Sequence, residues 1–262
     1  MLNPIRIILT YFRIGVLGEL EYRANFFVQI FESIIGMVVS LGGLAVVFNH
    51  TDSLAGWLPD HLIALVGIHM LMGGLINLVI NPSMQRFMED VRKGTLDFVL
   101  TKPADSQLLV SVQRIEIWKL VDVGLGTAVL TVALVRLGTV IGWGETGVFF
   151  IAFLAGAVIV YSFWLMLATI SFWFVRVENI LVIFQSMYNA GRWPVGIYPQ
   201  WLRFALTFLV PVAFAVTVPA EGLIGRLTNQ TLLMALGLAV GMLVISRFFW
   251  RLGLRHYSGA SA

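Results

Sequence analysis

The stretch from Met88 to Leu109 reads MEDVRKGTLDFVLTKPADSQLL and gathers charged residues in a chain of which only 12% is charged. Apolar runs of membrane length, Leu62–Ile80 and Leu120–Val135, stand on its two sides. A hydrocarbon core about 30 Å thick needs roughly 20 apolar residues in a helix. The polar stretch must therefore lie outside the membrane, and its side of the bilayer sets the orientation of every other segment.

The composition indicates a protein solvated mainly by lipid. The chain has 262 residues, is 59% hydrophobic and has a mean hydropathy of +0.90, whereas soluble domains are about 45–50% apolar. The absence of cysteine excludes disulfides, thiolate metal sites and a cysteine nucleophile. The four histidines have no metal-ligand spacing, so we expect no metal site. In a membrane protein the net charge of +3 reflects loop orientation, so we expect no nucleic-acid partner.

The hydropathy pattern predicts an all-α polytopic membrane protein, with residues 1–262 as a single domain. Six transmembrane helices are expected, at Phe26–Phe48, Leu62–Ile80, Leu120–Val135, Val148–Val175, Ile180–Val195 and Leu232–Trp250. A seventh apolar stretch, Phe204–Val218, is short and is interrupted by Pro211 and bounded by Pro219. Such a segment suits a re-entrant hairpin whose backbone is buried in protein. We therefore expect extracellular re-entrant helices within residues 196–230.

The distribution of Lys and Arg predicts that both termini are cytoplasmic. With that orientation, 13 of the 17 Lys and Arg residues fall on the inner side, as the positive-inside rule requires. The four on the outer side are Arg136, Arg192, Arg203 and Arg226, and Arg192 and Arg203 are the weak point of this assignment. If Ile180–Ala190 were only an interfacial helix, these arginines would be cytoplasmic and Phe204–Val218 would be the fifth span.

The N-terminal residues 1–24 fit a helix that lies in the headgroup layer. Arg6, Thr10 and Arg13 recur at i, i+4 and i+7, next to an apolar face. A poorly ordered tail is the alternative.

The polar segment 82–106 is expected to fold as a separate cytoplasmic helix. The residue before a proline avoids the α region, so Asn81-Pro82 should end the second span and begin a new helix. One face of this helix would carry an apolar stripe with helical spacing, formed by Met84, Phe87, Met88 and Val91.

The end of that helix also has a clear signature. Gly94 is placed to cap it, with Arg92 and Lys93 at the negative end of the helix dipole. A second short element begins near Asp97, and Asp105 or Ser106 caps the helix that leads into the third span. The apolar stripe either rests on lipid or on the chain's own helices, or it docks into a groove of a partner protein.

Two stretches resemble the permeases of type-2, export-class ATP-binding cassette (ABC) transporters. The first is MEDVRKGTLDFVLTKPADSQLLV, in which Gly94, Thr95, Leu96, Asp97 and Pro103 stand at the matching positions. The second is RWPVGIYPQWLRFALTFLVPVAFA, where the match is carried by Pro194, Tyr198, Pro199, Trp201, Leu202 and Pro211, while Val210 stands where asparagine is common. The resemblance covers essentially the whole chain.

This resemblance implies a transport subunit in the plasma membrane of a prokaryote, paired with a second permease chain and driven by separate ATPase subunits. The second permease would more often be a different chain than an identical copy. No Gly-Lys dipeptide occurs, so the chain lacks a Walker A loop. We expect no cofactor in this chain and no enzymatic activity of its own; ATP and Mg²⁺ would be bound by the partner.

The resemblance also implies which residues couple ATP hydrolysis to transport. They are Met84, Phe87, Met88, Val91, Arg92, Lys93, Gly94 and Asp97. On this view Phe87→Asp should uncouple ATPase activity from transport while leaving membrane insertion intact.

Three ionisable residues inside the expected spans are candidates for the substrate pathway: Glu32, His69 and Asp122. Burying charge in a membrane is costly, so such residues are often functional. The structural alternative is a pair between Lys119 and Asp122, with His69 bonded to a neighbouring helix. A membrane-embedded enzyme would need a catalytic cluster, which the sequence does not show. An ion-coupled carrier usually has repeats with broken helices, and we detect no repeat.

Overall fold

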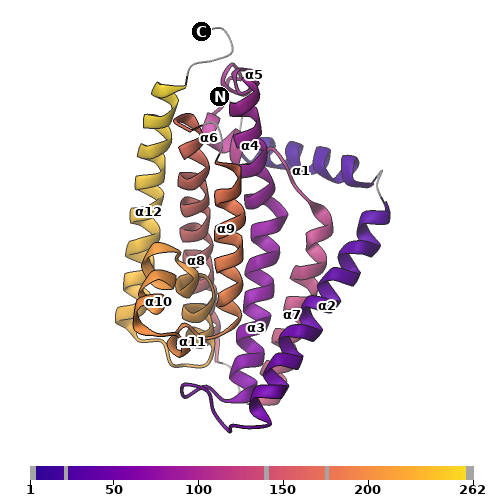
Figure 1. Ribbon diagram of the computed structural model, residues 1–262, viewed down its shortest axis with the longest axis vertical. Coiled ribbons are helices and arrows are strands. Elements are labelled where there is room, and N and C mark those ends of the chain that lie inside the picture. Colours follow the sequence, from indigo (N-terminus) through magenta and orange to yellow (C-terminus); the bar gives the residue numbers. More distant parts are fainter. Residues whose placement is uncertain (1–3, 21–22, 139–141, 175–176, 258–262) are drawn as a thin grey trace.

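The computed structural model describes residues 4–20, 23–138, 142–174 and 177–257, and these form a bundle of helices with no named strand (Figure 1). Within these residues, five helices are long and apolar enough to cross a membrane, or six if one bent pair is a span. They are Ala24–Phe48, Pro59–Lys93, Ile117–Leu137, Trp143–Phe172 and Asn229–His256, and the bent pair is Gln200–Leu209 with Ala213–Leu223. The predicted all-α polytopic membrane fold is confirmed.

The helices follow one another with short connections. The long ones are α2 (Arg23–Phe48), α3 (Pro59–Leu75), α7 (Leu120–Leu137), α8 (Trp143–Thr169) and α12 (Asn229–His256). The N-terminal helix is α1 (Pro4–Leu20), and the shorter elements between the long helices are η1 (Ile76–Ile80), α4 (Asn81–Lys93), α5 (Asp97–Leu100), α6 (Ser106–Ser111), η2 (Ile117–Lys119), η3 (Ile170–Phe172), α9 (Glu178–Tyr188) and η4 (Asn189–Arg192). Before α12 come η5 (Val195–Ile197), α10 (Gln200–Phe204), η6 (Ala205–Leu209), η7 (Ala213–Thr217) and α11 (Val218–Leu223).

The two ends of the bundle differ. Helix α1, helices α4 to α6 and the last turns of α12 gather at one end, which we call the N/C end (Figure 1). The opposite end, which we call the hairpin end, carries α10 and α11 (Figure 1). Helix α1 lies crosswise at the N/C end (Figure 1), while residues 1–3 and 21–22 of the predicted segment 1–24 lie outside the described residues. Its position in the headgroup layer stays a prediction. The helix has exposed apolar side chains at Leu9, Ile14 and Leu17.

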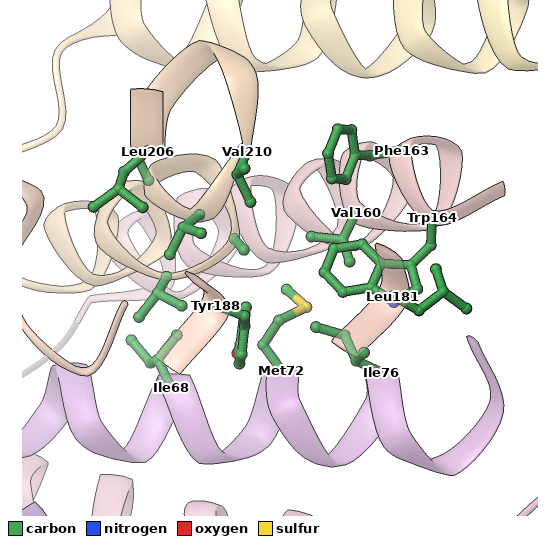
Figure 2. Close-up of a cluster of buried hydrophobic side chains, with 14 of the residues drawn as sticks. Ile68, Met72, Ile76, Val160, Phe163, Trp164, Leu181, Tyr188, Leu206 and Val210 are labelled. Carbon is green, nitrogen blue, oxygen red and sulfur yellow. The ribbon is translucent and has the colours of Figure 1, made fainter. Parts of the chain in front are cut away.

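The core lies where α3 and α8 meet α9 and the bent pair. Ile68, Met72 and Ile76 face Val160 and Trp164 across this core, together with Tyr188 (Figure 2). Helices α2, α7 and α12 surround it and keep most of their apolar surface outside. Apolar surface that already faces lipid gains no hydrophobic free energy from contact with another helix, so close packing holds these helices together.

Close packing of α3 on α7 depends on glycine. A Cβ added at Gly126 would lie 2.7 Å from the Leu71 nitrogen, and one at Gly67 would lie 2.8 Å from the Leu130 nitrogen. A Cβ added at Gly74 would likewise lie 2.7 Å from Val123 Cγ2. Gly237 and Gly241, in contrast, have no described neighbour within 4 Å.

The second span does not end at Asn81-Pro82, which corrects the sequence prediction. Helix continues from Pro59 to Lys93 without a break. Asn81 has α-helical dihedrals (φ −60°, ψ −51°), and its N–H bonds to the Ile76 carbonyl, five residues back. The π-helical turn of η1 widens the helix before Pro82, so the proline ring is accommodated without ending it. The polar helix is thus a rigid extension of the span.

The fifth predicted span is shorter than expected. Helix α9 covers Glu178–Tyr188, and the 3₁₀ turn η4 carries it to Arg192. It runs alongside α3 (Figure 1) but is not among the helices long enough to cross a membrane. The following pair bends by 77° at residues 209–213, a geometry that fits a broken span or the expected re-entrant hairpin, which stays a prediction.

Candidate functional site

The first candidate site is a polar cavity of about 240 Å³ between α2, α3, α7 and α9. All three residues that the sequence singles out inside the spans, Glu32, His69 and Asp122, line it. They come from three different helices, so only the packing brings them together. The structure therefore places the candidate substrate-pathway residues around one space.

Asp122 is bound by α2 and not by its own helix. Ser33 donates a hydrogen bond to Asp122 Oδ1, and Gln29 Nε2 donates one to Oδ2 at 3.3 Å. Gln29 and Ser33 are both buried and are also bonded to each other at 2.8 Å. No ion pair between Lys119 and Asp122 occurs in the described part of the chain, so the expected i, i+3 pair is corrected. Donors one turn apart on α2 already satisfy the carboxylate.

His69 is fixed by Tyr188 of α9. Their rings stack with centroids 4.6 Å apart and an angle of 16°, and the Tyr188 hydroxyl donates to the His69 carbonyl at 2.8 Å. The side chain of His69 is almost fully buried, yet its Nδ1 atom has no hydrogen-bond partner among the described residues. The expectation that the His69 ring bonds to a neighbouring helix is therefore not met at this atom.

Two further cavity residues have unpaired buried atoms. These are Arg192 Nε and Gln185 Oε1, for which the described residues supply no partner. A buried polar atom without a partner costs about 1–3 kcal/mol. Three such atoms around one cavity indicate a site that a polar group completes.

Sequence reasoning missed part of this site. It did not single out Gln29, Ser33 or Gln185, and it used Arg192 only to test the topology. The available signal was the spacing of Gln29, Glu32 and Ser33 within an otherwise apolar span, which puts them on neighbouring helical positions.

The second candidate site is the connection between α4 and α7, residues 94–119, at the N/C end. Gly94 adopts the left-handed conformation (φ 70°) and caps α4, with Arg92 and Lys93 in the last turn, as predicted. Asp105 caps α6 and accepts a hydrogen bond from the Leu108 N–H at 3.0 Å.

The apolar stripe of α4 packs on the chain's own helices. Met84, Phe87 and Met88 have exposed fractions of 0%, 0% and 3%, while Val91 is half-buried. The Phe87 ring contacts Phe172 at 5.3 Å and Trp250 at 5.0 Å between centroids. Of the alternatives left open by the sequence, packing on the chain itself is the one found. Phe87→Asp would therefore disturb the fold and is not a clean test of coupling.

The connection is tied firmly to α4 through Asp90. This buried carboxylate accepts hydrogen bonds from Thr95 Oγ1 at 2.8 Å and from Gln113 Nε2 at 3.2 Å. Arg86 approaches it at 3.3 Å. Ser83 adds a bond to the Arg114 carbonyl at 2.8 Å. These bonds join the connection to the α3–α4 helix.

The connection is also bound to α12. Arg247 pairs with Asp105, with one bond of 3.0 Å to Oδ1, and also donates to Gln107 Oε1 at 2.8 Å. Hydrogen bonds from Arg247 hold the pKa of the Asp105 carboxyl below its usual range. Trp250 Nε1 donates to Ser106 Oγ at 3.3 Å. The connection therefore joins the second and last spans.

One large apolar side chain of the connection is left open. Phe98 on α5 has an exposed fraction of 74%, although its neighbours Leu96 and Val99 are buried. Asp97, the last of the predicted coupling residues, begins α5. The exposed part of α4 carries charged side chains such as Arg86 and Lys93.

Comparison with known proteins agrees with this architecture. The family model of the ABC-2 family transporter proteins matches residues 34–261, which is most of the chain. No curated protein sequence matches the chain. A bundle with several membrane-length helices, together with a family match over most of its length, identifies the chain: it belongs to the ABC-2 family transporter proteins.

Proposed function

We propose that this chain is the membrane-spanning permease of an exporter, acts as a dimer with a second permease chain, and is driven by separate ATPase subunits at its N/C end. The N/C end would then be cytoplasmic, in the plasma membrane of a prokaryote. The family match supports the transporter class. The second permease, whether a different chain or a copy, would complete the pathway.

The observation that carries the coupling role is the rigid connection with an exposed aromatic tip. Phe98 is open to a partner, and the Asp90 and Asp105 contacts join its segment to α4 and α12. Closure of two ATPase subunits on ATP would displace this segment. Because α4 continues α3 without a break, the displacement would reach the middle of the membrane.

The coupling residues predicted from the sequence take two roles on this view. Arg92, Lys93, Gly94 and Asp97 lie at the end of α4 or the start of α5, next to Phe98. Met84, Phe87, Met88 and Val91 transmit the displacement from inside, because they pack α4 on the bundle.

The test is co-purification with the ATPase subunit, followed by ATPase and transport assays in vesicles. Phe98→Asp should weaken association about tenfold or more, because an exposed aromatic anchor typically contributes 2 kcal/mol or more to an interface. Phe98→Leu is the matched control and should retain most of the association. Normal association and coupled transport by Phe98→Asp would contradict this assignment.

A further inference from the structure

A second cavity, lined mainly by apolar side chains, adjoins the polar one. It measures about 570 Å³ and lies between α2, α3 and α7, nearer the hairpin end. Met37 borders both cavities. We refer to the two cavities together as the channel: its part toward the N/C end is polar, and its other part is apolar except for Arg136.

All three helices that line the channel show the same change from polar to apolar. On α2, Gln29 and Ser33 precede Met37, and Leu41 and Leu44 follow it toward the hairpin end. Helices α3 and α7 repeat this order. Along α3 and its continuation η1, Ile63 lies in the apolar part, and His69 and Asn77 lie in the polar part. Along α7, Asp122 lies in the polar part, and Leu125 and Val132 lie in the apolar part.

The charges in the polar part are ordered by depth. Glu32, Lys119 and Asp122 lie near the N/C end, where α2 and α7 begin, while Arg192 lies at the far end of η4. Glu32 and Arg192 form no ion pair with any described residue, and Arg192 Nε and the nearby His69 Nδ1 are buried without a partner. The channel thus has two carboxylates and the Lys119 ammonium group near its mouth, a guanidinium deeper inside, and an apolar groove beyond.

We propose that this channel binds one zwitterionic amphiphile, with an ammonium group at Glu32, an anionic phosphate at Arg192 and a hydrocarbon tail in the apolar groove. This order matches a phosphoethanolamine-type headgroup, whose amine is farther from the tail than its phosphate. A lipid of the N/C-side leaflet has the same direction, with the headgroup at that surface and the tail toward the bilayer centre. The inference rests on the proposed function, because an exporter must load its substrate from that side.

The contacts explain why both ends of such a ligand are needed. Arg192 would gain a charge-assisted bond to phosphate, and His69 could donate or accept through Nδ1. Asp122 is already satisfied by Gln29 and Ser33, so Glu32 is the carboxylate available to the ammonium group. Leu41, Leu44 and their neighbours would surround the hydrocarbon tail and keep it apart from the polar groups.

The experiment is a titration of the purified full-length chain in detergent with lysophosphatidylethanolamine, followed by native mass spectrometry. Lysophosphatidylglycerol tests the need for the amine, and phosphoethanolamine without a tail tests the need for the groove. Arg192→Gln should weaken lysophosphatidylethanolamine binding about tenfold, since a hydrogen bond to a charged group is worth roughly 1.5–3 kcal/mol. Arg203→Gln, an arginine outside both cavities, is its matched control and should bind normally.

Two more variants test the other ends of the channel. Glu32→Gln should reduce the preference for lysophosphatidylethanolamine over lysophosphatidylglycerol. Ala128→Trp should fill the apolar groove and weaken both lysolipids, whereas Val240→Trp, on the exposed face of α12, should weaken neither. Equal binding by Arg192→Gln and Arg203→Gln would show that water alone fills the polar part and would overturn the inference.

The outcomes separate this inference from the proposed function. Binding is measured on the chain alone, whereas the proposed function is tested by association with an ATPase. Two results together would overturn the lipid assignment and show that a second copy covers the cavity. The first is quantitative disulfide formation between two chains that carry Ser40→Cys, and the second is lysolipid binding that Arg192→Gln leaves unaffected. They would leave the ATPase-driven permease in place.

Discussion

At the scale of single residues, burial decides what each coupling candidate can do. Phe87 and Phe98 lie eleven residues apart in the same polar segment, yet one is fully buried and the other is 74% exposed. The apolar stripe of α4 is therefore part of the core, and the exposed surface proposed to meet the ATPase begins beyond it. The same sequence pattern predicts helix at both places and does not distinguish their surroundings.

Phe87→Asp should destabilise the chain by about 3 kcal/mol or more, because it buries a carboxylate without a partner among aromatic rings. Phe87→Leu should cost only about 1–1.5 kcal/mol. Thermal unfolding and the yield of monodisperse protein in detergent would measure both. Phe98→Asp serves as the exposed control and should unfold like the wild type; equal losses at the two positions would contradict the burial argument.

Asp105 offers a second test at this scale. Asp105→Asn keeps a good N-cap for α6 but removes the ion pair with Arg247. Both partners are more than a third exposed, so the expected loss is small, about 0.2–1 kcal/mol. Asp105→Ala also removes the cap and should lose about 1 kcal/mol more. Similar melting temperatures for the two variants would argue against the capping role.

The pH dependence of this pair has a definite sign. The folded pKa of Asp105 is lowered, so its contribution to stability is fully present above the ordinary Asp pKa of about 3.9 and is lost as the pH falls below it. The stability difference between wild type and Asp105→Asn should therefore be constant near neutrality and shrink below about pH 4. A difference that grows on acidification would contradict the assignment.

At the scale of elements, the rigid unit is the 35-residue helix from Pro59 to Lys93 and its contact with α7. Glycines on both helices let their backbones approach, since no hydrophobic force drives helices together in lipid. The π-helical turn keeps this unit continuous past Pro82. Movement at the N/C end can therefore reach the polar cavity, because His69 lies on the same helix.

Gly126→Ala should separate α3 from α7 and destabilise the chain by about 1–3 kcal/mol, because the new Cβ would lie 2.7 Å from backbone. Gly124→Ala, two residues away on the same helix, has no described neighbour within 4 Å and is the matched control. Thermal unfolding of both variants in detergent measures the difference. Equal stability of the two would contradict the close packing at Gly126.

At the scale of the whole molecule, the sequence provides a direct test of orientation. The chain has no cysteine, so single-cysteine variants report on one position at a time. Thr101→Cys lies in the α4–α7 connection and Ser53→Cys lies at the opposite end of the bundle. In intact cells, a membrane-impermeant maleimide should label Ser53→Cys and not Thr101→Cys. The reverse pattern would invert the proposed orientation.

The sequence by itself determined the helical membrane fold and the caps at Gly94 and Asp105. These depend on hydropathy and on local backbone preferences, which neighbouring residues carry. Only the tertiary structure decided that the helix continues through Asn81-Pro82, that Phe87 is buried, and that Glu32, His69, Asp122 and Arg192 share one cavity. The reason is that these features depend on packing between helices that are distant in the sequence. Local backbone preferences do not specify which helix faces will pack together.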